Sequence, residues 1–153
     1  MTKFGVRMEI IMNILVIDAQ GGGIGKQLIM AIKQNITKAE ITAVGANSAA
    51  TSAMLKSGAD YGATGENAVV VGCRKADIIV GPIGIVIADA LFGEITPRMA
   101  QAVGQSPAKK ILIPINHCEN IVVGVADLSI AAMVQGVVKE IQSITDKQFN
   151  NIK

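Results

Sequence analysis

The chain has 153 residues, about the length of one ordinary domain, and half of them are hydrophobic. It carries three Phe, one Tyr and no Trp, so its core must be aliphatic, a composition that suits parallel α/β layers. Its 14 basic and 12 acidic residues give a net charge of +2, which is too small and too dispersed for a nucleic-acid partner.

The longest apolar stretch beyond the first strand, residues 78–88, is shorter than a membrane-spanning helix requires. Cys73 and Cys118 lie far apart, so we expect reduced thiols rather than a disulfide framework. The start of the chain superficially resembles a signal peptide. Glu9 and Asn13 interrupt its apolar run, however, and processing would remove the first strand. We therefore expect a soluble, cytoplasmic protein without a membrane partner.

Residues 1–11 are predicted to be an N-terminal extension, and residues 12–153 a single Rossmann-like domain. The first predicted strand, residues 12–18, is apolar apart from Asn13, which is typical of a strand buried on both faces. The glycines at 21, 22, 23 and 25 follow it, and the helical pattern that begins at Ile24 comes next. Strand, glycine loop and helix in this order predict an anion-binding crevice, because the loop exposes N–H groups and a helix N-terminus favours negative charge. The alternative is that the glycines only permit tight packing between the strand and the helix.

The remaining elements alternate between strands and helices. We expect strands at 41–44, 61–64, 77–80 and 111–113, with an antiparallel edge strand at 121–123. We expect helices from Asn47 or Ser48 to Gly58, over 66–76, from Thr96-Pro97 to a stop at Gly104, and from Asp127 or Ser129 onward. This alternation predicts a three-layer Rossmann-like α/β fold with a mostly parallel sheet of five to six strands in the order 3-2-1-4-5.

In such a sheet, ligands bind beyond the carboxyl ends of the strands, where the strand order reverses. Two glycine-rich loops should meet there, at residues 18–26 and 81–84, with polar residues from neighbouring strand ends in support. The predicted ligand-binding residues are Asp18, Gln20, Gly21, Gly22, Gly23, Ile24, Gly25, Lys26, Asn47, Thr64, Glu66, Asn67, Gly81, Pro82, Gly84 and Asn116. No metal site is predicted.

Two known nucleotide motifs match the loop only in part. Gln20 stands where the dinucleotide fingerprint has its first glycine, and no acid for the ribose follows the second strand. A P-loop would need Ser or Thr after Lys26, where this chain has Gln27. The cofactor is therefore unknown, with NAD, NADP or another nucleotide as open candidates.

Several side chains have a structural and a chemical interpretation. Asp18 can bind a metal or act as a base, but an aspartate before a glycine loop more often accepts N–H bonds from that loop. Glu66 is favoured as a helix-start residue. Catalysis by His117 and Cys118 is disfavoured, because neighbouring residues at a strand end point to opposite faces. Residues 83–95 form an apolar segment that suits a lid, a subunit contact or ordinary core packing.

Six segments together resemble the bacterial domain-of-unknown-function 3842 family. They are VIDAQGGGIGK at 16–26, TSAMLK at 51–56, ATGENA at 63–68, ADIIVGPIG at 76–84, GEITP at 93–97 and KILIP at 110–114. The resemblance covers most of residues 12–138 and implies a small Rossmann-like protein. It supplies no activity and no catalytic residue.

Our leading hypothesis is a protein that binds a nucleotide or another phosphorylated small molecule, as a sensor or as a subunit of a larger enzyme. One alternative is a small enzyme that uses Asp18, Glu66, Asn116 or His117. Another is a ligand-free module that forms homo-oligomers through residues 83–95 and the last helix.

Overall fold

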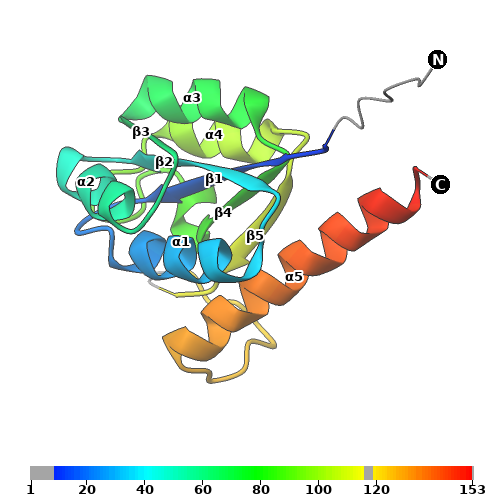
Figure 1. The fold of residues 1–153 in the computed structure, drawn as a ribbon. Helices are drawn as coiled ribbons and strands as arrows, with labels where there is room; N and C mark the ends of the chain where they lie inside the picture. Colours follow the sequence, from blue (N-terminus) through cyan, green and yellow to red (C-terminus); the bar gives the residue numbers. More distant parts are fainter. Residues whose placement is uncertain (1–8, 116–118, 153) are drawn as a thin grey trace, which may run out of the picture.

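The computed structural model describes residues 9–115 and 119–152. A five-stranded sheet lies between two layers of helices (Figure 1). The strands are β1 (Met12–Asp18), β2 (Ala39–Gly45), β3 (Tyr61–Thr64), β4 (Ile78–Pro82) and β5 (Lys109–Ile113). All pairs are parallel and the order is β3-β2-β1-β4-β5, which confirms the predicted topology.

Helices cover both faces of the sheet. They are α1 (Gly23–Asn35), α2 (Ser48–Lys56), α3 (Glu66–Lys75), α4 (Pro97–Gln105) and α5 (Ile130–Asn150), with a short 3-10 helix η1 (Ile83–Val86) after β4. Helix α1 contacts α2 and α5 on one side, and α3 contacts α4 on the other (Figure 1). The sheet separates two hydrophobic cores, one covered by α1, α2 and α5 and the other by α3 and α4. Ile14 and Val16 of β1 belong to the first of these cores, and Leu15 and Ile17 to the second. Because successive side chains of β1 enter opposite cores, nearly every residue of this strand is apolar.

Polar side chains begin three of the helices. Asn47 Oδ1 accepts the Ala50 N–H at 2.9 Å, and Thr96 Oγ1 accepts the Met99 N–H at 3.1 Å ahead of Pro97. Ser129 Oγ accepts the Ala132 N–H at 3.1 Å, so Ser129 rather than Asp127 begins the last helix. Each cap satisfies an N–H group that the helix itself leaves without a partner.

The structure corrects the predicted edge strand and the predicted end of α4. Residues 121–123 form no strand; Ile121 and Val123 are instead 88% and 93% exposed, so the predicted antiparallel edge strand is absent from the described chain. Three apolar residues in a row do not make a strand without a neighbouring ladder that pairs with them. Helix α4 also continues past Gly104 to Gln105, since a lone glycine costs helix stability but does not force an end.

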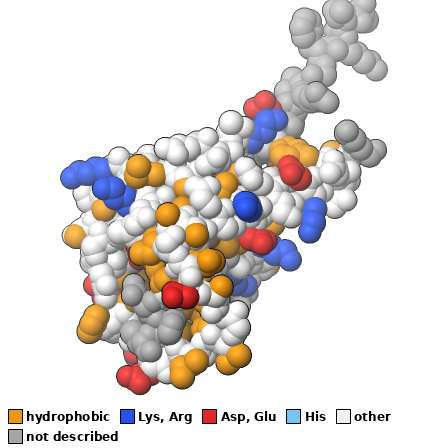
Figure 2. Space-filling model, turned by 90° about the horizontal axis from the view of Figure 1, so that it is seen from below, with side chains coloured by type: hydrophobic (Ala, Val, Ile, Leu, Met, Phe, Trp, Pro, Cys, Tyr) orange, Lys and Arg blue, Asp and Glu red, His pale blue; other side chains and the backbone are white. Residues whose placement is uncertain are grey.

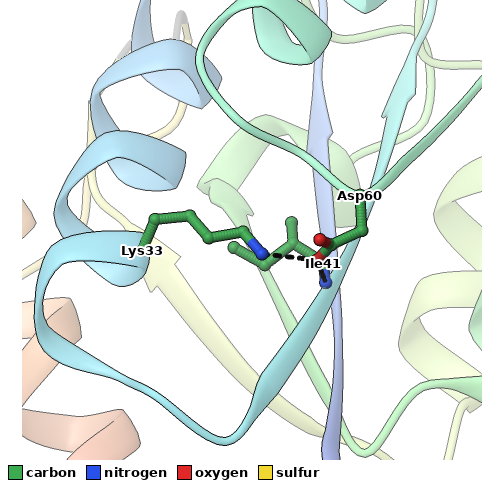
Figure 3. Close-up of polar contacts among 3 residues, drawn as sticks. All are labelled: Lys33, Ile41 and Asp60. Atoms are coloured by element: carbon green, nitrogen blue, oxygen red, sulfur yellow. Dashed lines mark hydrogen bonds and ion pairs between the residues drawn. The ribbon is translucent and has the colours of Figure 1, made fainter.

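Asp60 ties the start of β3 to α1 and β2. Its Oδ2 atom accepts the Lys33 ammonium at 2.6 Å and the Ile41 N–H at 2.8 Å (Figure 3). Partial burial acts to raise the pKa of Asp60, but these donors and the charge of Lys33 together hold it below its ordinary value. The contact fixes the edge strand β3 against the helix layer that contains α1.

Among the described residues, no helix has both the length and the apolar character that crossing a membrane would take.

Candidate functional site

Asp18 ends β1 and organises the glycine loop around its buried carboxylate. The side chain is 5% exposed, and its two oxygens accept the Ala19 N–H at 2.8 Å and the Gly25 N–H at 2.7 Å. Burial raises the pKa of Asp18; the N–H groups of Gly25, Ala19 and Ile24 oppose this, and the charge of Glu94 adds to it. Asp18 therefore does what the structural interpretation predicted, since it accepts N–H bonds at the start of α1.

A second carboxylate reaches the same loop from the connection between β4 and α4. Glu94 Oε2 accepts the Gln20 N–H at 2.6 Å. Asn47, which caps α2, contacts both of these residues. Its Nδ2 atom donates to the Gln20 carbonyl at 2.8 Å and to the two Glu94 carboxylate oxygens at 3.1 and 3.2 Å. Gln20 has a φ of 54°, in the region that favours glycine. Two of these hydrogen bonds hold Gln20 in this conformation, and the two between Asn47 and Glu94 join its partners to each other.

Two of the loop glycines are needed for packing. Gly22 has a φ of 73°, and a Cβ there would lie 2.9 Å from the backbone of Ala50 in α2. A Cβ on Gly25 would collide with the Met54 side chain and lie 3.0 Å from the Asp18 Cβ. At these positions the packing alternative explains the glycine without a ligand.

Gly21 and Gly23 differ from these two. A Cβ on either would meet no heavy atom within 4 Å, and neither N–H group has a hydrogen-bond partner among the described residues. Both line a cavity of about 310 Å³ at the carboxyl ends of β1 and β4. Its walls are formed by Asp18, Ala19, Gln20, Gly21, Gly22, Gly23, Ile24, Gln27, Pro82, Leu91 and Ile130.

The structure brings seven of the predicted site residues into this cavity and leaves others outside it. Lys26 lines a separate groove with Met30 and Lys56. Gly81 packs so closely on β1 that a Cβ would lie 2.5 Å from the Ile17 carbonyl oxygen. Gly84 is less tightly packed, since a Cβ there would lie 3.1 Å from Cγ of the Leu91 side chain.

Thr64 at the end of β3 and Glu66 just after it have partners of their own. The Thr64 hydroxyl lies 2.7 Å from the Thr51 hydroxyl, and Glu66 faces Arg98 across 3.6 Å. Neither Glu66 nor Asn67 lines the cavity. Asn116, proposed as a ligand-binding residue, lies outside the described residues, as do His117 and Cys118. In the part of the chain that is described, no three His, Cys, Asp or Glu side chains gather as metal ligands would.

Sequence reasoning missed the residues that close the cavity from the far side. Leu91 is buried although it lies in a connection, and Leu91, Phe92 and Gly93 have φ values of 55°, 58° and 81°. Ile130, the first residue of α5, also lines the cavity. The apolar character of residues 83–95 was the available signal, but nothing local indicated that Glu94 would reach Gln20.

A larger hollow of about 660 Å³ lies between α3 and the part of the sheet formed by β1, β2 and β3. Tyr61, Val71 and Gly72 are among its lining residues, and none of the predicted site residues that the structure describes is. Its position is away from the glycine loop, so the smaller cavity is the candidate site.

A parallel sheet in the order 3-2-1-4-5 between two helix layers, with a glycine loop at the point where the order reverses, defines a Rossmann-like α/β protein. Residues 13–146 match the model of the family described as domain of unknown function DUF3842. The chain belongs to this family.

One solved structure with a similar fold is the dodecameric FMN-dependent UbiX-like decarboxylase from Escherichia coli O157:H7. The alignment covers 86% of this chain and 76% of that chain, at 17% identity and a TM-score of 0.45. No curated protein matches the chain.

Proposed function

We propose that this chain binds a nucleotide or another phosphorylated small molecule in the cavity beside the glycine loop, as a sensor or as a subunit of an enzyme. The main support is that two backbone N–H groups without a hydrogen-bond partner among the described residues lie beside a cavity. Gly21 and Gly23 both line the cavity, and neither N–H group has a partner in the described chain. Gly23 is also the first residue of α1, where the helix dipole favours an anion.

The other N–H groups of the loop limit where a phosphate can bind. Asp18 takes those of Ala19 and Gly25, Glu94 takes that of Gln20, and the Ala19 carbonyl takes that of Gly22. A phosphate therefore bonds to Gly21 and Gly23 rather than to the whole loop. Leu91 and Ile130 offer apolar wall for the body of the ligand, and Gln27 offers a polar group.

A thermal-shift screen with NAD, ATP, CoA and sugar phosphates tests the proposal. A ligand at about a hundredfold over its Kd stabilises the native state by about 2.7 kcal/mol, which is a clear rise in Tm. The Gly21→Ala and Gly23→Ala variants should fold normally and bind at least about tenfold more weakly, because the added methyl takes space that a phosphate needs. Gly136→Ala is the matched control, since its Cβ also meets open space but lies in α5.

No shift for any compound at millimolar concentration would contradict the proposal. So would full affinity in the double variant Gly21→Ala with Gly23→Ala, because the ligand would then bind elsewhere.

Self-association is a second candidate function, favoured by exposed apolar side chains. Phe92 is 96% exposed at the tip of the β4–α4 connection, and Ile121, Val123 and Leu128 are exposed between β5 and α5. Figure 2 shows several groups of hydrophobic side chains on the face seen from below, the side on which that second connection lies in Figure 1. Sedimentation velocity tests this function: wild type should form a defined oligomer, and Phe92→Ser should weaken it. A wild type that stays monomeric at high concentration would contradict it.

A further inference from the structure

We propose that Glu94 restricts the site to compact phosphate esters and excludes dinucleotides. The inference rests on the proposed function, because it concerns which phosphorylated ligand the cavity accepts. In dinucleotide-binding folds the pyrophosphate lies over the glycine loop, and the adenosine ribose lies against the end of the second strand.

In this chain the corresponding path is occupied by the protein. Asn47, two residues after the end of β2, uses its side-chain amide to bind both Gln20 and Glu94. The Glu94 carboxylate bonds to the Gln20 N–H in the first turn of the loop. A ribose that approached β2 would have to displace this carboxylate, and a second phosphate over Gln20 would meet its negative charge.

The cavity extends from the loop toward β4 rather than toward β2. Its walls come from the loop itself, the end of β1, the start of α1, Pro82 at the end of β4, Leu91 and Ile130, and no residue of β2 or α2 contributes. Its volume of about 310 Å³ is at the lower end of the range of about 300–1,000 Å³ for small-molecule sites. One phosphate and a body the size of a sugar fit this space better than two nucleosides do.

Glu94 is held in place by the connection that carries it. Leu91 and Ile95, on either side of Glu94, are both buried in the core that α3 and α4 cover. The connection bonds to itself through Asp89 N–H to the Ile95 carbonyl at 2.8 Å and Glu94 N–H to the Leu91 carbonyl at 3.2 Å. The backbone that carries Glu94 is therefore held in place. Moving the Glu94 carboxylate away from Gln20 breaks charge-assisted hydrogen bonds, which a free surface side chain would not have to do.

Calorimetric titration of the wild-type protein with inorganic phosphate, ribose 5-phosphate and NAD tests the inference. Ribose 5-phosphate should bind, and NAD should bind at least about tenfold more weakly. In Glu94→Ala the difference in affinity, measured as the Kd for NAD divided by the Kd for ribose 5-phosphate, should fall by at least about tenfold, because the path toward β2 opens. Glu140→Ala is the control: it removes an exposed carboxylate on α5 that does not line the cavity, and it should leave the difference in affinity unchanged.

The outcomes separate this inference from the function on which it rests. Tighter or equal binding of NAD by the wild type would overturn the inference and leave phosphate binding intact. Binding of none of the three compounds, nor of any phosphate ester, would remove the proposed function itself. If Glu94→Ala does not fold, the wild-type comparison still decides, and Glu94→Gln, which keeps an acceptor oxygen for Gln20, takes its place in the second comparison.

Discussion

Asn47 Nδ2 lies 3.1 and 3.2 Å from the two carboxylate oxygens of Glu94, although the residues are 47 positions apart in the chain. The contact joins the end of β2 to the connection between β4 and α4, and both partners also bind Gln20. The glycine loop is therefore positioned by Asn47 after β2 and by Glu94 in the β4–α4 connection, as well as by Asp18.

This contact predicts the effect of Asn47→Asp. Aspartate keeps the oxygen that caps α2, but it loses the donor and places a second negative charge beside Glu94. We expect a loss of about 1–2 kcal/mol in the free energy of unfolding, measured by urea titration. Adding Glu94→Gln should restore part of it, because the amide removes the repulsion and supplies a donor. Independent, additive effects of the two changes would show that the residues do not interact.

Gly22 and Gly136 should respond to alanine in opposite directions. Gly22→Ala should cost about 2 kcal/mol, since the residue has a positive φ and its Cβ would meet the Ala50 backbone at 2.9 Å. Gly136→Ala should stabilise by about 0.5–1 kcal/mol, because it lies within α5 with open space around it. Equal urea midpoints for the two variants would contradict the packing role of Gly22.

Thr51 is predicted to stabilise the ends of β2 and β3 through its hydroxyl. Oγ1 lies 3.2 Å from the Gly45 N–H, 3.1 Å from the Ala63 carbonyl and 2.7 Å from the Thr64 hydroxyl. Thr51→Val keeps the shape and removes these bonds, and it should cost about 2 kcal/mol in chemical denaturation. Thr51→Ser keeps the hydroxyl and should cost less. A smaller loss for valine than for serine would assign the role of Thr51 to its methyl group instead.

Asp60 predicts a pH dependence of stability. Because its pKa is lowered in the folded protein, the carboxylate contributes stability above its ordinary pKa of 3.8, and the contribution is lost as pH falls through the folded value. Asp60→Asn should therefore be less stable by about 1 kcal/mol at neutral pH, since the pair with Lys33 is partly exposed. The difference should disappear in strong acid, measured by urea unfolding across an acid series. A difference independent of pH would rule out the ion pair as its source.

Much of the fold follows from local pattern. The apolar run of β1, the caps at Asn47 and Thr96 and the alternation of strands and helices each follow from local physics, and together they predict the strand order. The failures lie where distant structure decides. Residues 121–123 are apolar enough for a strand, but whether a strand forms depends on a pairing partner.

The candidate site was less predictable for the same reason. Its glycines are visible in the sequence, but only the packing of α2 separates Gly22, which needs to be glycine, from Gly21 and Gly23, which have open space. The acid after β2 that a dinucleotide requires is absent from the sequence. The acid that does reach this point, Glu94, comes from a connection far along the chain, and no local pattern indicates where its side chain ends.

Amide NMR of the ¹⁵N-labelled protein during titration with ribose 5-phosphate and inorganic phosphate tests ligand binding at the loop most directly. The N–H signals of Gly21 and Gly23 should move most and saturate, while those of Gly104 and Gly136 should stay in place. Stationary signals at Gly21 and Gly23 throughout the titration, with or without movement elsewhere, would contradict the proposed site.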